Sequence, residues 1–237
     1  MILLDPRNRD AFHNRAVAYS ARKEFDRAIT DYTEAIKLDP HEARAYAARG
    51  ALYSAKRNYE GAIADYTAVI EIDPRNRNAF YSRGIAHRSK QDYDRAIADF
   101  TEAIRLDPGS GSAYAARGNS YSAKRDYDRA IADYSDAVRL DPKDRISFYN
   151  RGIVYRAKQD YDRGIADFTA AIALDPSDAA AFTIRGDSYF AKRDYQRAIA
   201  DYAEAIRLDP KDRGAFNGRG LAYHTRQNLQ LRTTLRR

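Results

Sequence analysis

The sequence predicts an all-α protein built as a solenoid of stacked helical hairpins. All seven prolines follow an aspartate, and successive prolines stand 34 residues apart from Pro6 to Pro210. A fixed period of this size indicates one supersecondary unit per repeat, which cannot bury its apolar face alone and therefore stacks on its neighbours. Within each period, apolar residues recur at spacings of three and four, as in amphipathic helices. Residues that recur in every unit are expected to hold the stack, so only deviations are candidate sites.

The period divides the chain into units without any insertion, each ending two residues after its proline. We expect a solenoid over residues 1–227: a partial unit at 1–8, full repeats at 9–42, 43–76, 77–110, 111–144, 145–178 and 179–212, and a half repeat at 213–227. After Gln227 the repeat pattern is lost, and residues 228–237 are expected to form an irregular basic tail or a makeshift helix. The chain is interpreted as a fragment of a longer array.

Each full repeat is predicted to contain two helices. In the third unit, Phe80, Gly84 and His87 mark one face of the first helix, and an apolar stripe from Tyr93 to Leu106 marks the second. With one exception, the residue before each first helix is Asn, Ser or Asp, which are good N-caps. The Asp-Pro pairs just upstream end the preceding helices. Each unit is therefore predicted to be a helical hairpin.

The recurring residue types carry a family resemblance. The fourth unit has a large aromatic, Gly, Tyr, Ala, aromatic, Ala and Pro at Tyr114, Gly118, Tyr121, Ala130, Tyr134, Ala137 and Pro142. This pattern resembles the tetratricopeptide repeat, and the resemblance covers residues 1–227. It implies a right-handed superhelical solenoid of helix-turn-helix repeats, with a concave groove lined by the first helices. The main departure is an Arg in every unit where the family usually has Leu, just before the Gly.

These arginines are matched by aspartates that recur at one place in the second helices. Both series lie on flanks that stacked hairpins press together, and the arginine fork suits bidentate pairing with a carboxylate. We therefore predict a structural ladder of ion pairs, with these members: Arg49, Arg83, Arg117, Arg151, Arg185, Asp65, Asp99, Asp133 and Asp167. The ladder nearly cancels its own charge, so the net charge of +7 gives little support to nucleic-acid binding.

Composition and motifs exclude several classes of protein. No apolar stretch approaches the roughly 18 residues of a membrane span, and no secretory signal is visible. The absence of cysteine excludes disulfides and thiolate metal sites, and it fits a cytoplasmic location. The four histidines are scattered without metal-ligand spacing, and no nucleophile stands with a unique base. We expect no enzyme activity, no metal and no cofactor.

Candidate binding residues are deviations on the groove face of the first helices. The trio Tyr, Ile, Arg occurs in the third unit and again in the fifth, with smaller residues between them. Duplication of two adjacent units would also explain the trios. The predicted ligand groove consists of Tyr81, Ile85, Arg88, Asn119, Tyr149, Asn150, Ile153, Arg156, Asp187 and Phe190.

The groove and the resemblance together predict a non-catalytic scaffold that binds a peptide or helix, with a preference for acidic side chains. The family's carboxylate clamp for chaperone tails is not expected, because Ala115, Ala180 and Ile184 stand where its basic residues would be. Two alternatives stay open: a helical-repeat RNA reader, and the interaction arm of a larger enzyme or sensor. Uncapped ends would also allow weak self-association, either as a two-fold dimer or head to tail.

Overall fold

The protein is all-α, as predicted. The computed structural model describes the backbone of residues 8–234 and the side chains of residues 8–229, and over that range it contains thirteen helices and no strand. The predicted partial unit lies, apart from its last residue, outside the described residues, as does the end of the predicted tail. None of the described helices is long and apolar enough to cross a membrane.

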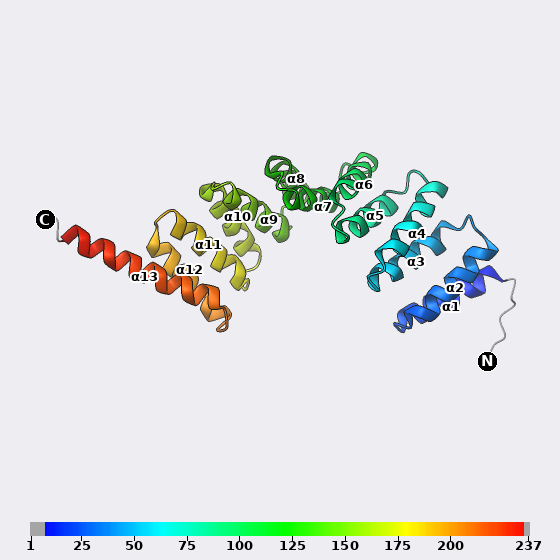
Figure 1. Ribbon diagram of the computed structural model, residues 1–237, viewed down its shortest axis with the longest axis horizontal. Helices are drawn as coiled ribbons and strands as arrows, with labels where there is room; N and C mark the ends of the chain where they lie inside the picture. Colours follow the sequence, from blue (N-terminus) through cyan, green and yellow to red (C-terminus); the bar gives the residue numbers. More distant parts are fainter. Residues whose placement is uncertain (1–7, 235–237) are drawn as a thin grey trace. The chain divides into compact units, whose positions relative to one another are not determined.

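The chain divides into two compact units, Met1–Ser120 and Tyr121–Arg237. In each, consecutive helices lie side by side in antiparallel pairs (Figure 1). Six helices and most of a seventh belong to the first unit: α1 (Arg9–Ala21), α2 (Phe25–Leu38), α3 (Ala43–Ala55), α4 (Tyr59–Ile72), α5 (Arg77–Ser89), α6 (Tyr93–Leu106) and α7 (Gly111–Ala123). The other helices belong to the second unit: α8 (Tyr127–Leu140), α9 (Arg145–Ala157), α10 (Tyr161–Leu174), α11 (Ala179–Ala191), α12 (Tyr195–Leu208) and α13 (Arg213–Thr234).

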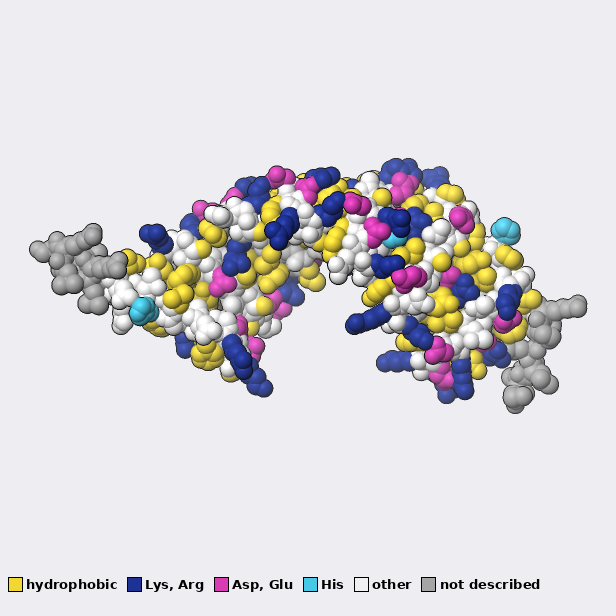
Figure 2. Space-filling model, viewed as in Figure 1, with side chains coloured by type: hydrophobic (Ala, Val, Ile, Leu, Met, Phe, Trp, Pro, Cys, Tyr) yellow, Lys and Arg dark blue, Asp and Glu magenta, His cyan; other side chains and the backbone are white. Residues whose placement is uncertain are grey.

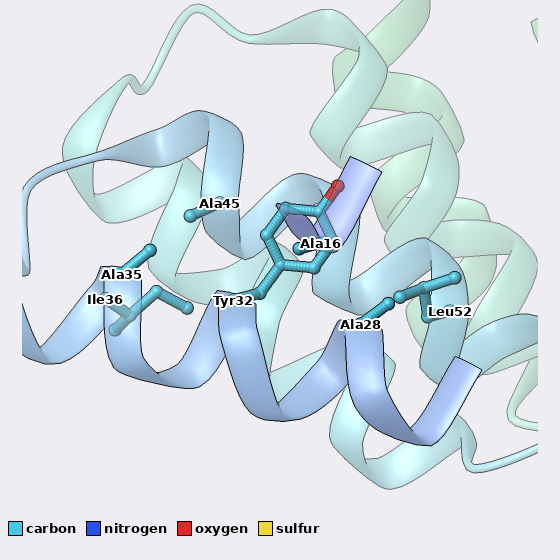
Figure 3. Close-up of a cluster of buried hydrophobic side chains, with 7 residues drawn as sticks. All are labelled: Ala16, Ala28, Tyr32, Ala35, Ile36, Ala45 and Leu52. Atoms are coloured by element: carbon cyan, nitrogen blue, oxygen red, sulfur yellow. The ribbon is translucent and has the colours of Figure 1, made fainter. Parts of the chain in front are cut away.

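The packing inside a hairpin depends on small residues facing an aromatic ring. In the first cluster the Tyr32 ring of α2 lies over Ala16 of α1, and Ala45 of α3 belongs to the same cluster (Figure 3). Glycines of the first helices allow the closest approach: a Cβ on Gly84 would stand 2.8 Å from the Phe100 ring. Because real Cβ atoms do not come so near, a side chain there would push the two helices apart.

The turn between the two helices of each hairpin contains one residue in the left-handed region. These residues are not glycine, although their φ angles lie between 59° and 63°: Lys23, Arg57, Gln91, Arg125, Gln159 and Arg193. The residue that follows caps the second helix with its side chain in every described hairpin except the first, where Glu24 makes no such hydrogen bond. The Asp160 carboxylate, for example, accepts a hydrogen bond of 3.2 Å from the backbone N–H of Arg163.

The last helix continues past the predicted end of the repeat. α13 runs past the expected boundary at Gln227 to Thr234, so residues 228–234 are helical, which was one of the two expectations for this stretch. This stretch contains no proline or glycine, so nothing in it stops a helix. The Asn228 amide also lies 3.3 Å from the His224 ring one turn earlier.

His87 replaces the tyrosine that the other described repeats carry at this place in their first helices. Its side chain is buried, and burial lowers its pKa below the ordinary value. Asp99 and Asp92, each 3.9 Å from a ring nitrogen, oppose this shift, whereas Arg83 and Arg95 add to it. The folded chain therefore binds a proton at His87 less readily than the unfolded chain does.

Replacing Gln159 by glycine should stabilise the protein by roughly 0.5–1 kcal/mol, since glycine adopts φ of 61° without a Cβ penalty. The measurement is the free energy of unfolding in urea. Gln159→Ala is the matched control and should give no gain. A destabilised Gln159→Gly variant would contradict this account of the turn.

Replacing His87 by tyrosine should raise stability, most of all in acid. Because the His87 pKa is lowered in the folded state, the wild type loses stability as the pH falls below about 6.5, where the unfolded histidine begins to charge. A tyrosine would also lie where Arg95 can stack on it, worth about 0.5–1 kcal/mol. Urea midpoints at pH 7.5 and 5.0 test this, with the exposed His41→Tyr as control. Equal acid sensitivity of wild type and His87→Tyr would refute it.

Candidate ligand-binding groove

In most repeats, the arginine before the glycine joins two neighbouring repeats. Arg151 of α9 donates to both oxygens of Asp167 on α10 at 2.8 Å, and its third nitrogen donates to the Ser135 hydroxyl of α8 at 2.9 Å. The carboxylate belongs to the arginine's own repeat and the hydroxyl to the preceding repeat. The same three contacts recur at Arg49 with Asp65 and Thr33, Arg83 with Asp99 and Thr67, and Arg185 with Asp201 and Thr169.

The carboxylates of these contacts are deeply buried. Asp65 is 3% exposed, and burial raises its pKa, an effect that Arg49 opposes. The hydrogen bond to Asp167 raises the pKa of the Arg151 guanidinium, so this guanidinium stays charged at neutral pH. The guanidiniums also lie over aromatic rings of their own helices, as Arg151 does over Phe148 at 5.6 Å. We call these contacts the arginine ladder, and they fix the orientation of each first helix.

Arg117 and Asp133, two predicted ladder members, belong to different compact units, and their pairing stays a prediction. Inside its own unit, Arg117 donates to the Thr101 hydroxyl at 3.0 Å. Arg15, at the start of the chain, makes the bidentate contact with Asp31 at 2.6 Å.

Truncation of Arg151 to alanine should cost about 3 kcal/mol, because it leaves the buried Asp167 carboxylate without its cation. Arg151→Lys should recover part of this loss, since a lysine restores charge but not the bidentate fork. Thermal and urea unfolding of the three chains provide the comparison. A loss below about 1 kcal/mol would mean that the pair behaves as an exposed surface pair.

Three groove residues of the first unit, Tyr81, Ile85 and Arg88, come from α5. Tyr81 and Ile85 pack against the cluster of Ala96, Phe100 and Ala116, and the Tyr81 ring lies 5.7 Å from the Phe100 ring. Tyr81 also lines a surface hollow together with Arg77, Asn78, Ala103, Ser110, Ser112 and Ala113. Arg88 is partly buried, and among the residues that the structure describes no carboxylate forms an ion pair with it.

The groove residues of the second unit form a more connected group. The Tyr149 ring of α9 lies 5.7 Å from the Phe168 ring, edge to face, and burial raises the Tyr149 pKa. Arg156, three residues after Ile153 on the same helix, lies 3.5 Å from the Asp187 carboxylate of α11. Both side chains of this ion pair are over a third exposed. The structure thus brings together Arg156 and Asp187, which the sequence places only on the same face.

The sequence reasoning missed Tyr202. Its hydroxyl donates to Asp187 at 2.9 Å from α12, and burial together with Asp187 raises its pKa. Asp187 is therefore held by a hydrogen bond from Tyr202 and by an ion pair with Arg156. The sequence did contain a signal, in the aromatic residue fifteen positions after this groove residue and its equivalents. Fifteen positions after the polar Asp187 stands Tyr202, which has a hydroxyl, whereas Phe100 and Phe168 stand at this spacing after the apolar Ile85 and Ile153.

The other predicted groove residues are more dispersed. Asn119 on α7 and Asn150 on α9 are both partly buried and belong to different compact units. The Phe190 ring lies 5.3 Å from the Tyr195 ring at the start of α12, so it contributes to the packing of its own hairpin. Within the described part of the chain, no cluster of three or more His, Asp or Glu could hold a metal ion.

Comparison with known proteins identifies the class of this fold. Sequence profiles of the tetratricopeptide repeat match residues 48–111 and 115–179, and further profiles of this repeat match residues 10–42 and 186–226. The chain belongs to the tetratricopeptide repeat family. A search of curated proteins gives no match.

Solved structures of repeat proteins share the fold. The C-terminal part of a TPR repeat-containing protein from Cytophaga hutchinsonii is 18% identical, with a TM-score of 0.76, covering 90% of this chain and 88% of that one. YrrB, described as a TPR protein with an unusual peptide-binding site, is 24% identical, with a TM-score of 0.69, covering 80% and 97%. MamA from Desulfovibrio magneticus is 19% identical, with a TM-score of 0.69, covering 74% and 98%. At these identities the likeness concerns the fold. This fold generally serves as a protein-interaction scaffold.

Proposed function

We propose that this chain is a non-catalytic scaffold that binds a peptide or helix along the groove face of its first helices. The supporting observation is the group in the second unit, where Tyr149, Ile153, Arg156 and Asp187 lie on two successive first helices and remain partly exposed. Tyrosine and arginine are enriched among binding hot spots, because they combine large contact area with polar groups. The peptide-binding site of YrrB supports the same use of the fold.

The two arginines of the trios differ in what they offer a ligand. Arg156 already lies beside Asp187, so an acidic ligand would have to compete with that carboxylate. The position that corresponds to Asp187 in the first unit is Asn119, so Arg88 has no such competitor. We therefore assign the preference for acidic side chains to Arg88. In the second unit the Arg156–Asp187 pair would instead select a ligand by hydrogen bonding, as with the main chain of an extended peptide.

The nucleic-acid alternative finds less support. Figure 2 shows lysine and arginine interspersed with aspartate and glutamate over the visible face, with no continuous basic stripe. Phosphate binding relies on such a stripe and weakens steeply with salt. The alternative role as an arm of a larger enzyme or sensor is compatible with a binding groove and would place the chemistry elsewhere.

Changing Tyr149 to alanine should weaken binding of a groove peptide by at least about 1 kcal/mol, because the anchor ring is lost. The probe is the tightest binder selected from a random peptide display library, measured by fluorescence anisotropy at low and high salt. The control is Leu174→Ala, since Leu174 is an exposed residue at the end of a second helix.

Three results would contradict the proposal: no library peptide that binds, equal affinity of the Tyr149→Ala variant, or a probe whose affinity collapses with salt as phosphate binding does. Circular dichroism and melting of Tyr149→Ala separate a lost contact from a lost fold, because the Tyr149 ring also packs against Phe168.

A further inference from the structure

The outward face of α13 repeats the surface that, in every preceding hairpin, receives a second helix. In α11 the corresponding residues are all engaged by α12: Arg185 pairs with Asp201, and a Cβ on Gly186 would lie 2.9 Å from the Tyr202 ring. Phe182 and Tyr189 pack against the same helix. The first-helix surface is thus a socket with three parts: a glycine that admits a ring, an arginine that pairs with an aspartate, and two flanking aromatics.

All parts of this socket are present on α13, and none is filled by the described residues. Nothing lies within 4 Å of a Cβ placed on Gly220. Phe216 and Tyr223 are 44% and 51% exposed. The Arg219 guanidinium lies over the Phe216 ring at 5.6 Å, and no carboxylate pairs with it among the side chains of residues 8–229.

The chain does not fold back over this face within the described range. A second helix would have to turn back soon after Tyr223, but α13 continues as one helix to Thr234. At 1.5 Å per residue, Thr234 lies about 22 Å along the axis from Arg219. We call the face of Phe216, Arg219, Gly220 and Tyr223 the α13 socket.

Charge decides which occupant fits. Residues 213–237 include six arginines and no aspartate or glutamate. Two copies of α13 packed face to face would therefore bring like charges together, with Arg219 unpaired in both. A second copy bound head to tail would place its α1 against the socket. Since α1 is a first helix and the socket matches a second helix, this copy does not fit. The occupant that satisfies Arg219 is an acidic helix with an aspartate directly before an aromatic residue, as in the Asp99–Phe100 pair of α6.

We propose that the α13 socket binds, in trans, an amphipathic acidic helix of a partner protein, whose Asp-aromatic pair reaches Arg219 and Gly220. The aspartate takes the bidentate place that Asp201 holds on Arg185, and the aromatic ring lies on Gly220 as Tyr202 lies on Gly186. This site is separate from the groove and does not depend on the function proposed for it.

The test uses a fluorescein-labelled synthetic peptide of residues Asp92–Leu106, the sequence of α6 with its N-cap, titrated with the intact 237-residue chain. Anisotropy should reveal saturable binding with Kd below about 100 μM. A control peptide with Asp99→Asn and Phe100→Ala should bind at least about tenfold more weakly.

Variants of the chain test whether the peptide binds at the α13 socket. Gly220→Leu should abolish binding while raising the melting temperature, because leucine fills the ring site and favours an exposed helix more than glycine does. Arg219→Ala should weaken binding about tenfold. Arg226→Ala removes the same charge but lies beside Gln196 of α12, and it should change affinity by less than about threefold.

Three outcomes would overturn the proposal. They are no saturable binding of the Asp92–Leu106 peptide, unchanged binding by Gly220→Leu, or equal losses from Arg219→Ala and Arg226→Ala, which would indicate charge attraction alone. The proposal would also be overturned if light scattering showed that the free chain is a dimer and that neither the peptide nor Gly220→Leu disturbs it. The α13 socket would then be covered by a second copy of the chain.

Discussion

The arrangement of the repeats depends on a buried charge that recurs in every second helix. Asp65, Asp99, Asp167 and Asp201 are each 6% exposed or less, and a carboxylate withdrawn from water in this way is costly unless it is paired and hydrogen-bonded. The arginine that pairs with this carboxylate also donates a hydrogen bond to a hydroxyl of the preceding repeat, as Arg185 does to Thr169 at 3.0 Å. One guanidinium thus closes a hairpin and joins it to its neighbour. Since the contact has a fixed fork geometry, it sets the angle at which each first helix presents its groove face.

The ladder also reduces the positive surface that a chain of net charge +7 would otherwise offer. Most ladder arginines are neutralised inside the stack, and lysines at the hairpin turns pair with acidic residues one repeat earlier, as Lys90 does with Glu60 at 2.6 Å. On the two proposed surfaces, Arg88 of the groove face and Arg219 of the α13 socket form no ion pair with a described carboxylate. Both proposed surfaces therefore favour acidic protein segments, through different contacts.

Much of the fold could be predicted from the sequence, because the same packing and pairing requirements recur in every repeat together with the residues that meet them. In most first helices a glycine is needed where a ring approaches, and the recurring Arg and Asp satisfy each other, so period and residue type together indicate both helices. The continuation of α13 was less predictable: loss of the repeat pattern after Gln227 signals loss of packing partners, but a stretch without proline or glycine can remain helical. The site was harder still. Arg156 and Asp187 stand 31 residues apart, and their contact depends on the angle between two hairpins, which no local pattern encodes.

The central claim is that each ladder arginine couples two repeats rather than serving its own hairpin alone. The most direct measurement is a double-mutant cycle between Arg83 and Thr67, which lie in successive repeats and whose side chains are 3.0 Å apart. The free energy of unfolding is measured in urea for the wild type, Arg83→Ala, Thr67→Val and the double variant. The account predicts a coupling of about 1.5 kcal/mol, the lower end for a hydrogen bond to a charged donor. A coupling near zero would contradict it, because the guanidinium would then stabilise only its own hairpin through Asp99.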